Sequence, residues 1–234
     1  MTLRKGDFIE IEFTGRLKEG EVFDSNIVDD LKKLHEGHDH PIETKPFVFC
    51  LGEQMFLQSI DDFLIGKSEP VKPTEYEISL TPEKAFGLRN QKLIMRIPEK
   101  VFREHRVNPI QGEVFNFDGR LAKILSVSGG RIMADFNSPL AGKEVFYKVI
   151  VKRKVDDLNE KVKALVEFFF KKELNFEIND KKLLIDIDEP LKKYAEMFKD
   201  KFMELLGLEL EVRGIKNNKT QGSEKTETVT EKLA

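Results

Sequence analysis

Short segments in which apolar and polar residues alternate, each bounded by turn residues, constrain the fold of this chain more than any other feature. Residues 8–14, 75–80 and 145–152 alternate in this way. A period of two residues is typical of a strand with one buried face. Residues 56–64 instead show the spacing of a short amphipathic helix, which ends at Gly66. The pattern predicts a small antiparallel β-sheet that wraps one short helix.

Two changes of pattern divide the chain further. Residues 90–136 contain strand-like runs of their own, with turn signals at Asp118-Gly119 and Gly129-Gly130. From residue 156 the periodicity reads helix, strand, strand, helix, strand, which is typical of an α+β domain. The sequence thus predicts an α+β protein built from a discontinuous domain at 1–89 plus 137–155, an inserted β-rich domain at 90–136, a C-terminal αββαβ domain at 156–215 and a disordered tail at 216–234.

Composition narrows the classes of function. Of the 234 residues, 35% are charged and the net charge is −3, which argues against a general binder of nucleic acid or of anionic membranes. No apolar run approaches the roughly 20 residues that span a bilayer. The charged first residues predict no signal peptide, and we expect a cytoplasmic protein. The single cysteine, Cys50, lies in an apolar run and is expected to be a buried thiol.

Signatures of the common catalytic classes are missing from the sequence. There is no GxSxG, P-loop, GxGxxG or HExxH motif. The carboxylate pairs Asp29-Asp30 and Asp61-Asp62 are expected to lie on the solvated surface. His35, His38 and His40 form a His-x-x-His-x-His segment that could supply imidazoles to a divalent metal ion. Such spacing is common in solvated loops and no cysteine is near, so we expect no metal and no cofactor.

Aromatic residues stand at the ends and connections of the predicted sheet, within recurring local words. These are Phe13-Thr14-Gly15, Gly20-Glu21-Val22-Phe23-Asp24-Ser25, Pro46-Phe47-Val48-Phe49-Cys50-Leu51-Gly52, Ala85-Phe86-Gly87 and, after the insert, Asn137-Ser138-Pro139-Leu140-Ala141-Gly142-Lys143. In this order and spacing, residues 1–155 resemble the FKBP-type peptidyl-prolyl cis/trans isomerases. The insert between the last two words resembles that of the SlyD-like branch and of long archaeal members.

The resemblance implies a proline pocket, with each role carried to a position in this sequence. The implied catalytic residues are Phe13, Asp24, Phe86 and Tyr147, of which Asp24 is the one charged group beside the pocket. Phe23 and Phe47 are the implied substrate-binding walls. The implied rim and floor are Phe56, Leu57 and Ile60, with the Leu57 N–H as donor to a substrate carbonyl. Phe13 and Phe86 replace frequent tyrosines, Ile60 a frequent tryptophan and Ser59 a usual glycine. These changes keep the pocket apolar and argue against a mechanism that needs a tyrosine hydroxyl.

Three functions stay open at this point. The resemblance implies an isomerase that acts on X–Pro bonds in unfolded or partly folded proteins and proline-containing peptides, with no cofactor and no covalent step. The alternatives are a holdase chaperone without isomerase activity, and an assembly scaffold that works through its C-terminal domain. Residues 90–136 carry a large apolar share for a domain of their size, so we expect them to bind client segments. The apolar helices of the C-terminal domain suggest a homodimer.

Overall fold

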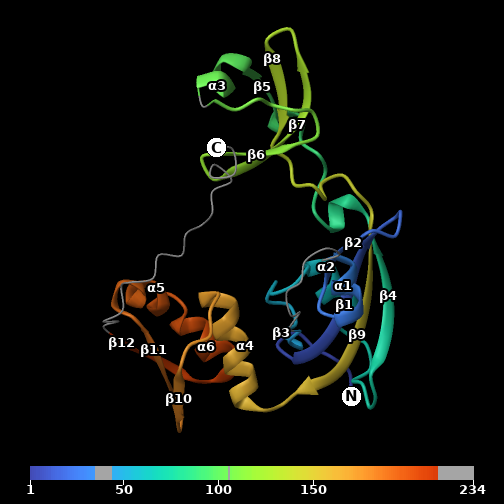
Figure 1. Ribbon diagram of the computed structural model, residues 1–234. Coiled ribbons are helices and arrows are strands. Elements are labelled where there is room, and N and C mark those ends of the chain that lie inside the picture. Colours follow the sequence, from blue (N-terminus) through green and yellow to red (C-terminus); the bar gives the residue numbers. More distant parts are fainter. Residues whose placement is uncertain (35–43, 105, 216–234) are drawn as a thin grey trace. The chain divides into compact units, whose positions relative to one another are not determined.

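The structure is a computed structural model that describes residues 1–34, 44–104 and 106–215 (Figure 1). It divides into two compact units, Met1–Lys154 and Val155–Ala234, which we describe separately. The expected disordered tail and the His35, His38 and His40 segment lie outside the described residues, so both expectations stay predictions.

A five-stranded sheet forms the body of the first unit. Its strands are β1 (Phe8–Leu17), β2 (Val22–Ser25), β3 (Phe47–Cys50), β4 (Thr74–Leu80) and β9 (Val145–Val155). The order is β2-β1-β9-β4, and β3 also pairs with β1. All registers that define β2, β3 and β4 are antiparallel. The expected antiparallel sheet is therefore present, and the strand that follows the insert lies at its centre.

Two α-helices accompany this sheet, α1 (Val28–Leu34) and α2 (Gln58–Leu64). Ile60 and Leu64 of α2 are fully buried, as their helical spacing predicts. The ring of Phe63 on α2 meets the ring of Tyr76 on β4 edge to face, with centroids 5.7 Å apart, so the helix lies over that strand. Cys50 is buried and free, as expected.

One edge of β1 serves two different strands. β3 pairs with β1 from Phe8 to Ile11, and β2 pairs with it from Thr14 to Arg16. The side chain of Asn26 fills the interval between them. Its Oδ1 accepts the Phe13 N–H at 2.7 Å, its Nδ2 donates to the Ile11 carbonyl at 3.0 Å, and its own backbone N–H donates to the Phe13 carbonyl at 3.2 Å. An amide side chain thus replaces a stretch of backbone ladder.

The inserted residues form a second sheet with a helix. Its elements are β5 (Ile94–Pro98), α3 (Glu99–Glu104), β6 (Val114–Phe117), β7 (Arg120–Ser128) and β8 (Arg131–Asp135), in the sheet order β5-β8-β7-β6. Both expected turns join adjacent strands, and all four of their residues have positive φ, which suits the right-handed twist of a hairpin. Phe102 of α3 is buried against Ala122, Ile124, Ile132 and Ala134, so one face of this sheet has its own core.

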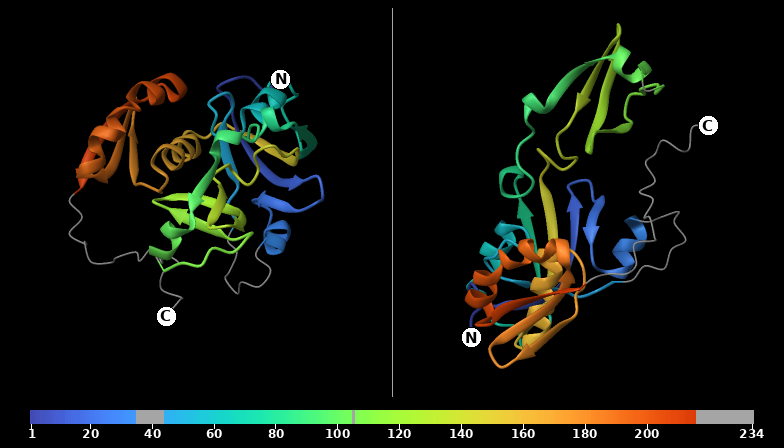
Figure 2. Two further views of the ribbon diagram at one scale, coloured as in Figure 1. Left: turned by 90° about the horizontal axis from the view of Figure 1, so that it is seen from above. Right: turned by 90° about the vertical axis from the view of Figure 1, so that its left-hand side faces the viewer.

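Two linkers connect the insert with the five-stranded sheet (Figure 2). The first contains two 3-10 turns, η1 (Pro82–Lys84) and η2 (Gln91–Leu93). The linkers are hydrogen bonded to each other: the Asn90 N–H donates to Asn137 Oδ1 at 2.8 Å, and Asn137 Nδ2 returns a bond to the Asn90 carbonyl at 3.0 Å. Arg89 and Asp135 add an ion pair across the same point. The insert therefore leaves and re-enters its host through one closed neck.

The second unit follows the predicted order of helix, two strands, helix and strand, with one difference. Its elements are α4 (Leu158–Phe170), β10 (Phe176–Asn179), β11 (Lys182–Asp188), η3 (Glu189–Leu191), α5 (Lys192–Glu196), α6 (Lys199–Leu206) and β12 (Glu209–Ile215). Asp157 caps α4 by accepting the Glu160 N–H at 2.9 Å. β11 pairs antiparallel with β10 and parallel with β12. The apolar stripe suggests a single second helix, but the structure has two. α5 ends at Glu196 and α6 begins at Lys199, with Met197 and Phe198 between them.

No helix in the described part of the chain is both long enough and apolar enough to cross a membrane.

Substitution of Asn26 tests the junction on β1. We expect Asn26→Ala to lower the free energy of unfolding by about 1–3 kcal/mol, because the Phe13 N–H and the Ile11 carbonyl lose their partner in a part-buried site. Urea unfolding followed by circular dichroism measures the change. Asn108→Ala, at an exposed position of the insert, is the matched control and should leave the midpoint unchanged. Equal midpoints for Asn26→Ala and the control would contradict this role.

Candidate functional site

Six aromatic rings from six separate segments meet at one end of the five-stranded sheet. Phe13 comes from β1, Phe23 from β2, Phe47 from β3 and Tyr147 from β9, while Phe56 precedes α2 and Phe86 follows η1. All six were expected from the sequence. We call this set the aromatic cluster.

The rings form one connected series of contacts. The Phe13 ring lies 4.7 Å from Phe56 and 6.1 Å from Phe47, centroid to centroid. Tyr147 meets both Phe56 and Phe23 edge to face at 5.7 Å, and Phe23 meets Phe86 in the same way at 5.7 Å. Edge-to-face packing is the arrangement that ring quadrupoles favour. Tyr147 and Phe13 are buried, whereas Phe23, Phe47, Phe56 and Phe86 are half-buried and keep part of their surface open to a ligand.

Gly15 makes room for two rings of the cluster. Its φ is ordinary, so backbone conformation does not explain the glycine. A Cβ at this position would stand 2.7 Å from the Phe23 ring and 3.0 Å from the Tyr147 ring. The glycine of the Phe13-Thr14-Gly15 word is therefore required by the close approach of Phe23 to β1.

Asp24 is the charged group of the site. Although its side chain is exposed in part, burial raises the pKa of its carboxyl, and a hydrogen bond from the Ser25 backbone offsets part of that rise. Burial also raises the pKa of the Tyr147 hydroxyl, and the negative charge of Asp24 adds to the effect. The two side chains are thus electrostatic neighbours, as the resemblance implied.

A polar network behind the cluster holds the strands that carry Phe13 and Asp24. Thr14 Oγ1 donates to Asp30 Oδ2 at 2.7 Å, and Ser25 Oγ donates to the Phe13 carbonyl at 2.9 Å. Arg16 donates to both oxygens of Asp30, at 3.1 and 3.2 Å. β1, β2 and α1 are thereby tied together within a few residues of the site.

The rim and floor residues come from the start of α2. Leu57 is the N-cap of the helix and has no side-chain capping bond. Among the described residues, none accepts a hydrogen bond from the Leu57 N–H. Ile60, one turn later, is fully buried. These three features fit the donor and floor that the resemblance implied.

The loop that carries Phe86 is tied down on both sides. Ser59 Oγ on α2 donates to the Lys84 carbonyl at 2.6 Å, and the Gly142 N–H, from the second linker, donates to the Gly87 carbonyl at 2.8 Å. A glycine, the usual residue at position 59, would lack the first bond. The Ser59 hydroxyl therefore ties the loop that carries Phe86 to α2.

Asp61 contradicts the surface expectation for its carboxylate pair. Its side chain is fully buried, with Oδ2 accepting the Gly52 N–H at 2.9 Å and Oδ1 without a partner among the described residues. Burial raises its pKa to about 6, against the lowering effect of backbone hydrogen bonds from Gly52 and Gln54. Asp61 thus anchors the loop that leads into Phe56 and Leu57.

The expectation that the carboxylate pairs lie on the solvated surface is also wrong for Asp30, which is 7% exposed. The sequence signal for both residues was helical position: Asp61 lies between Ile60 and Leu64 on the buried side of α2. Sequence reasoning also missed Phe49, whose ring stacks on Phe47 at 5.3 Å and meets Phe56 at 5.9 Å.

No group of three or more His, Cys, Asp or Glu side chains suited to a metal ion occurs in the part of the chain that the structure describes. The histidine segment falls outside that part, so its metal binding is not decided by this observation.

The site is a ring-lined apolar surface with one carboxylate at its edge, an arrangement whose size and chemistry suit a small apolar ring or side chain. Two parts of the chain match known protein families. Residues 1–101 match the family of FKBP-type peptidyl-prolyl cis-trans isomerases, and residues 95–140 match the FKBP26 IF domain.

Three curated relatives are similar over the same part of the chain. A short-type peptidyl-prolyl cis-trans isomerase of Methanocaldococcus jannaschii is 28% identical over 150 residues, which are 64% of this chain and 92% of that protein. The isomerase SlyD of Aeromonas hydrophila is 26% identical over 62% of this chain and 60% of its own. The FKBP-type 16 kDa isomerase of Escherichia coli K12 is 31% identical over 46% of this chain and 72% of its own.

This chain belongs to the FKBP-type peptidyl-prolyl cis-trans isomerase family. The resemblance drawn from the local words is confirmed, including its SlyD-like and archaeal affinity. The enzyme class is peptidyl-prolyl cis-trans isomerase.

Titration of Asp61 gives a prediction with a definite sign. Its pKa is about 6 in the folded chain and about 3.9 in an unfolded one, so the folded state binds the proton more tightly. The free energy of unfolding should therefore fall as pH rises from 4 to 6, by about 2–3 kcal/mol, and stay lower above pH 6. Urea unfolding at several pH values measures this contribution as the difference between wild type and Asp61→Asn.

Asp118→Asn is the control, because Asp118 is an exposed turn residue of the same unit and is not among the groups that shift the pKa of Asp61. Its difference from wild type should be flat over the same pH range. A flat difference for Asp61→Asn as well, or one of opposite sign, would contradict the raised pKa.

Proposed function

We propose that this chain is a folding enzyme that binds unfolded segments through residues 90–136 and isomerises their X–Pro bonds at the aromatic cluster. The single observation that carries the proposal is the cluster itself, since six rings from six segments form one connected series of contacts and Asp24 acts electrostatically on one of them, Tyr147. The family and the names of the relatives support isomerase activity; recruitment of clients by the insert is our own step.

Roles follow from place and chemistry. Phe13, Phe86 and Tyr147 act with Asp24 on the prolyl bond, and Phe23 and Phe47 line the ring-binding surface. Phe56, Leu57 and Ile60 form the rim and floor, and the Leu57 N–H donates to a substrate carbonyl. The support for the last role is that this N–H has no acceptor among the described residues.

Isomerisation needs no covalent step here. Rotation about a peptide bond has a barrier of about 18–20 kcal/mol because amide resonance is lost. The twisted amide carries less charge separation than the planar one, so an apolar site that removes water from the carbonyl destabilises the planar form more. A decrease of about 5 kcal/mol gives several thousandfold, at about 1.4 kcal/mol per tenfold. The uncatalysed step takes tens to hundreds of seconds, slow enough to limit folding.

Apolar exposure in the insert supports a client-binding role. Ile110, Val114 and Leu121 are 53%, 59% and 63% exposed, although the same domain has a closed core on one side of its sheet. β6 (four residues) is an edge strand of the sheet. Because it is at the edge, an extended segment can add to it through main-chain hydrogen bonds. A tether of this kind raises the concentration of a held proline near the site to about millimolar.

Two other functions remain as alternatives. A holdase without isomerase activity would bind clients with the same insert, but the complete aromatic set favours an enzyme. An assembly scaffold would act through residues 156–215, and it predicts that this unit alone binds a partner.

The proposed homodimer rests on the second unit. Leu191, Tyr194, Met197 and Met203, on or beside α5 and α6, are exposed apolar residues close in sequence. Such surfaces mark interfaces. Sedimentation at tens of micromolar decides between dimer and monomer.

Two substitutions test the site. Asp24→Ala and Phe86→Ala should each lower kcat/KM for a short X–Pro peptide at least tenfold, because each removes a group that surrounds the prolyl ring. Asp62→Ala and Phe146→Ala, exposed residues outside the cluster, are matched controls and should keep the wild-type rate. Wild-type rates in both site variants, with unchanged circular dichroism, would reject the site assignment.

Removal of the insert separates recruitment from chemistry. We expect a variant with residues 91–136 replaced by a short Gly-Ser link to isomerise a short proline peptide at a rate near wild type. Its catalysis of proline-limited refolding of an unfolded protein should fall at least tenfold, because the client is no longer held near the site. Equal retention of both activities would mean that the insert does not recruit substrate.

A further inference from the structure

The insert sheet has one face without a covering helix. Alternation along the strands separates the buried face, which holds Ile124, Ile132 and Ala134, from an opposite face that we call the outer face. Among the side chains that the registers place on the outer face are the apolar Ile94, Val114, Leu121 and Met133 and the cationic Arg96, Lys123 and Arg131. Apolar surface and positive charge are therefore mixed on one side of this sheet.

Apolar and cationic side chains are direct neighbours there. Val114 on β6 lies opposite Lys123 on β7, and Leu121 is two residues from Lys123 on the same face. Met133 on β8 lies opposite Arg96 on β5 and two residues from Arg131. Opposite residues of antiparallel strands have Cβ atoms about 4.5–5.5 Å apart, and diagonal ones about 7–8 Å. One extended segment can contact both kinds of side chain.

The three cations are not neutralised within the chain. All three are exposed, and none has an ion pair or hydrogen-bonded acid among the described residues. The acidic residue that the strand registers place on this face, Asp135, is already engaged by Arg89 and by the backbone and side chain of Asn137. Burial opposes ionisation of Asp135, but those contacts outweigh it and lower the pKa of the carboxyl. Asp135 is therefore a carboxylate that already has its partners.

Charge distribution along the sequence agrees with this local view. Residues 90–136 contain eight Lys and Arg against five Asp and Glu, a net charge of +3, whereas the whole chain has −3. The rest of the protein is therefore acidic, and the positive charge is concentrated in the inserted domain. Complementary charge at an interface directs partner choice more than it adds affinity.

We propose that the outer face selects extended, unfolded segments that carry both Asp or Glu and apolar residues on the same side of the chain. This rests on the proposed function, because it names the class of client that the insert takes. An extended segment that crosses the four strands on this face turns every second side chain toward the sheet, whose strands together span about 14 Å. Its apolar residues cover Val114, Leu121 and Met133, and its carboxylates meet Lys123, Arg96 and Arg131.

Peptides without proline test the selection apart from isomerisation. The probe is a fluorescein-labelled 12-residue peptide in which Val-Leu pairs alternate with Glu-Glu pairs, so that each side of the extended chain carries both kinds of residue. Its twin carries Lys in place of Glu. At low salt the full-length chain should bind the Glu peptide about tenfold more tightly than the Lys twin, since exposed ion pairs each give roughly two- to fivefold. The preference should shrink at high salt, where exposed charges are screened.

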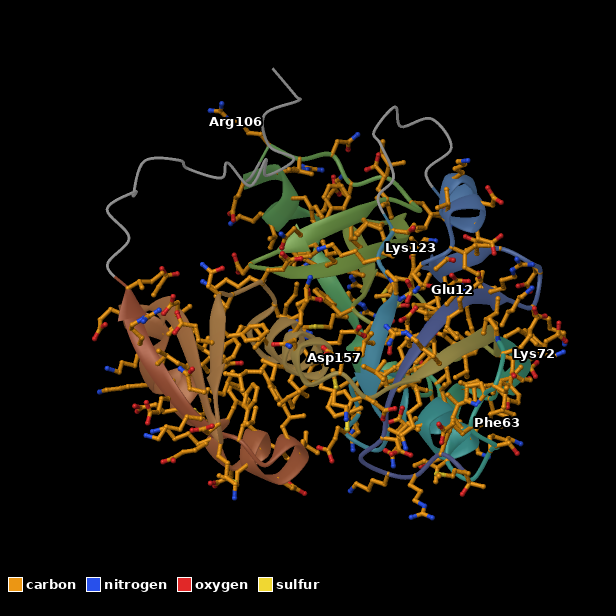
Figure 3. All side chains as sticks on the ribbon, turned by 90° about the horizontal axis from the view of Figure 1, so that it is seen from below. Glu12, Phe63, Lys72, Arg106, Lys123 and Asp157 are labelled. Carbon is orange, nitrogen blue, oxygen red and sulfur yellow. The ribbon has the colours of Figure 1, made fainter. Side chains whose placement is uncertain are left out.

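A charge-reversal variant identifies the face. Arg96→Glu, Lys123→Glu and Arg131→Glu together should abolish or invert the preference, and a glutamine version should reduce it. Lys18→Glu, Lys72→Glu and Lys193→Glu make the same change in net charge at exposed positions outside the insert and should retain the preference (Figure 3 shows Lys72 and Lys123). The charge-reversal variant should keep its wild-type activity on a short X–Pro peptide.

The outcomes distinguish this inference from the proposed function. Equal binding of both peptides by the wild type overturns charge selection and leaves client holding intact, whereas binding of neither overturns client holding as well. An equal loss of preference in the control variant, or equally tight and equally sensitive binding of a thymidine oligonucleotide, would assign the effect to general polyanion attraction and overturn the proposal.

Discussion

The isomerase sheet depends on how one edge of β1 is shared between two strands. β2 and β3 both need that edge, and neither pairs with Glu12 or Phe13. The Phe13 ring meets three other rings of the aromatic cluster. An unpaired backbone group at this depth would cost free energy comparable to a lost hydrogen bond. Because Asn26 supplies the missing partners, the strand can change neighbours where the site requires it. The site exists at a discontinuity of the sheet that one amide side chain closes.

Polar groups stand behind the rings rather than among them. Asp30 joins Thr14 and Arg16, and Asp61 holds Gly52, so each buried carboxylate fixes backbone that carries a residue of the site. The front of the cluster presents hydrocarbon and, at its edge, Asp24. Such an arrangement separates the work of positioning from the work of excluding water, and both are needed for catalysis by environment alone.

The rings of the cluster were predicted through the local words that carry the family resemblance, because several short words in one order fix the positions of several rings at once. Strand segments of the insert were also predictable, since alternation and paired turn residues agree. The helix α3 was not, because six residues carry too little periodicity. Burial of Asp30 and Asp61 was missed because composition favours exposed carboxylates, and only tertiary partners decide otherwise. The Ser59 tether depends on a carbonyl 25 residues away, which no local pattern reveals.

The position of the insert in the sequence, ahead of the central strand of its host sheet, has a consequence for the order of synthesis. β9 lies between β1 and β4, so the host sheet lacks its central strand until the ribosome has made residues 145–155. All four strands of the insert are complete by residue 135, and their pairings are local hairpins apart from that of β5. The nascent chain therefore holds the complete sequence of the inserted domain before the sheet that carries the aromatic cluster can close. The two parts of this isomerase thus become able to fold one after the other during synthesis.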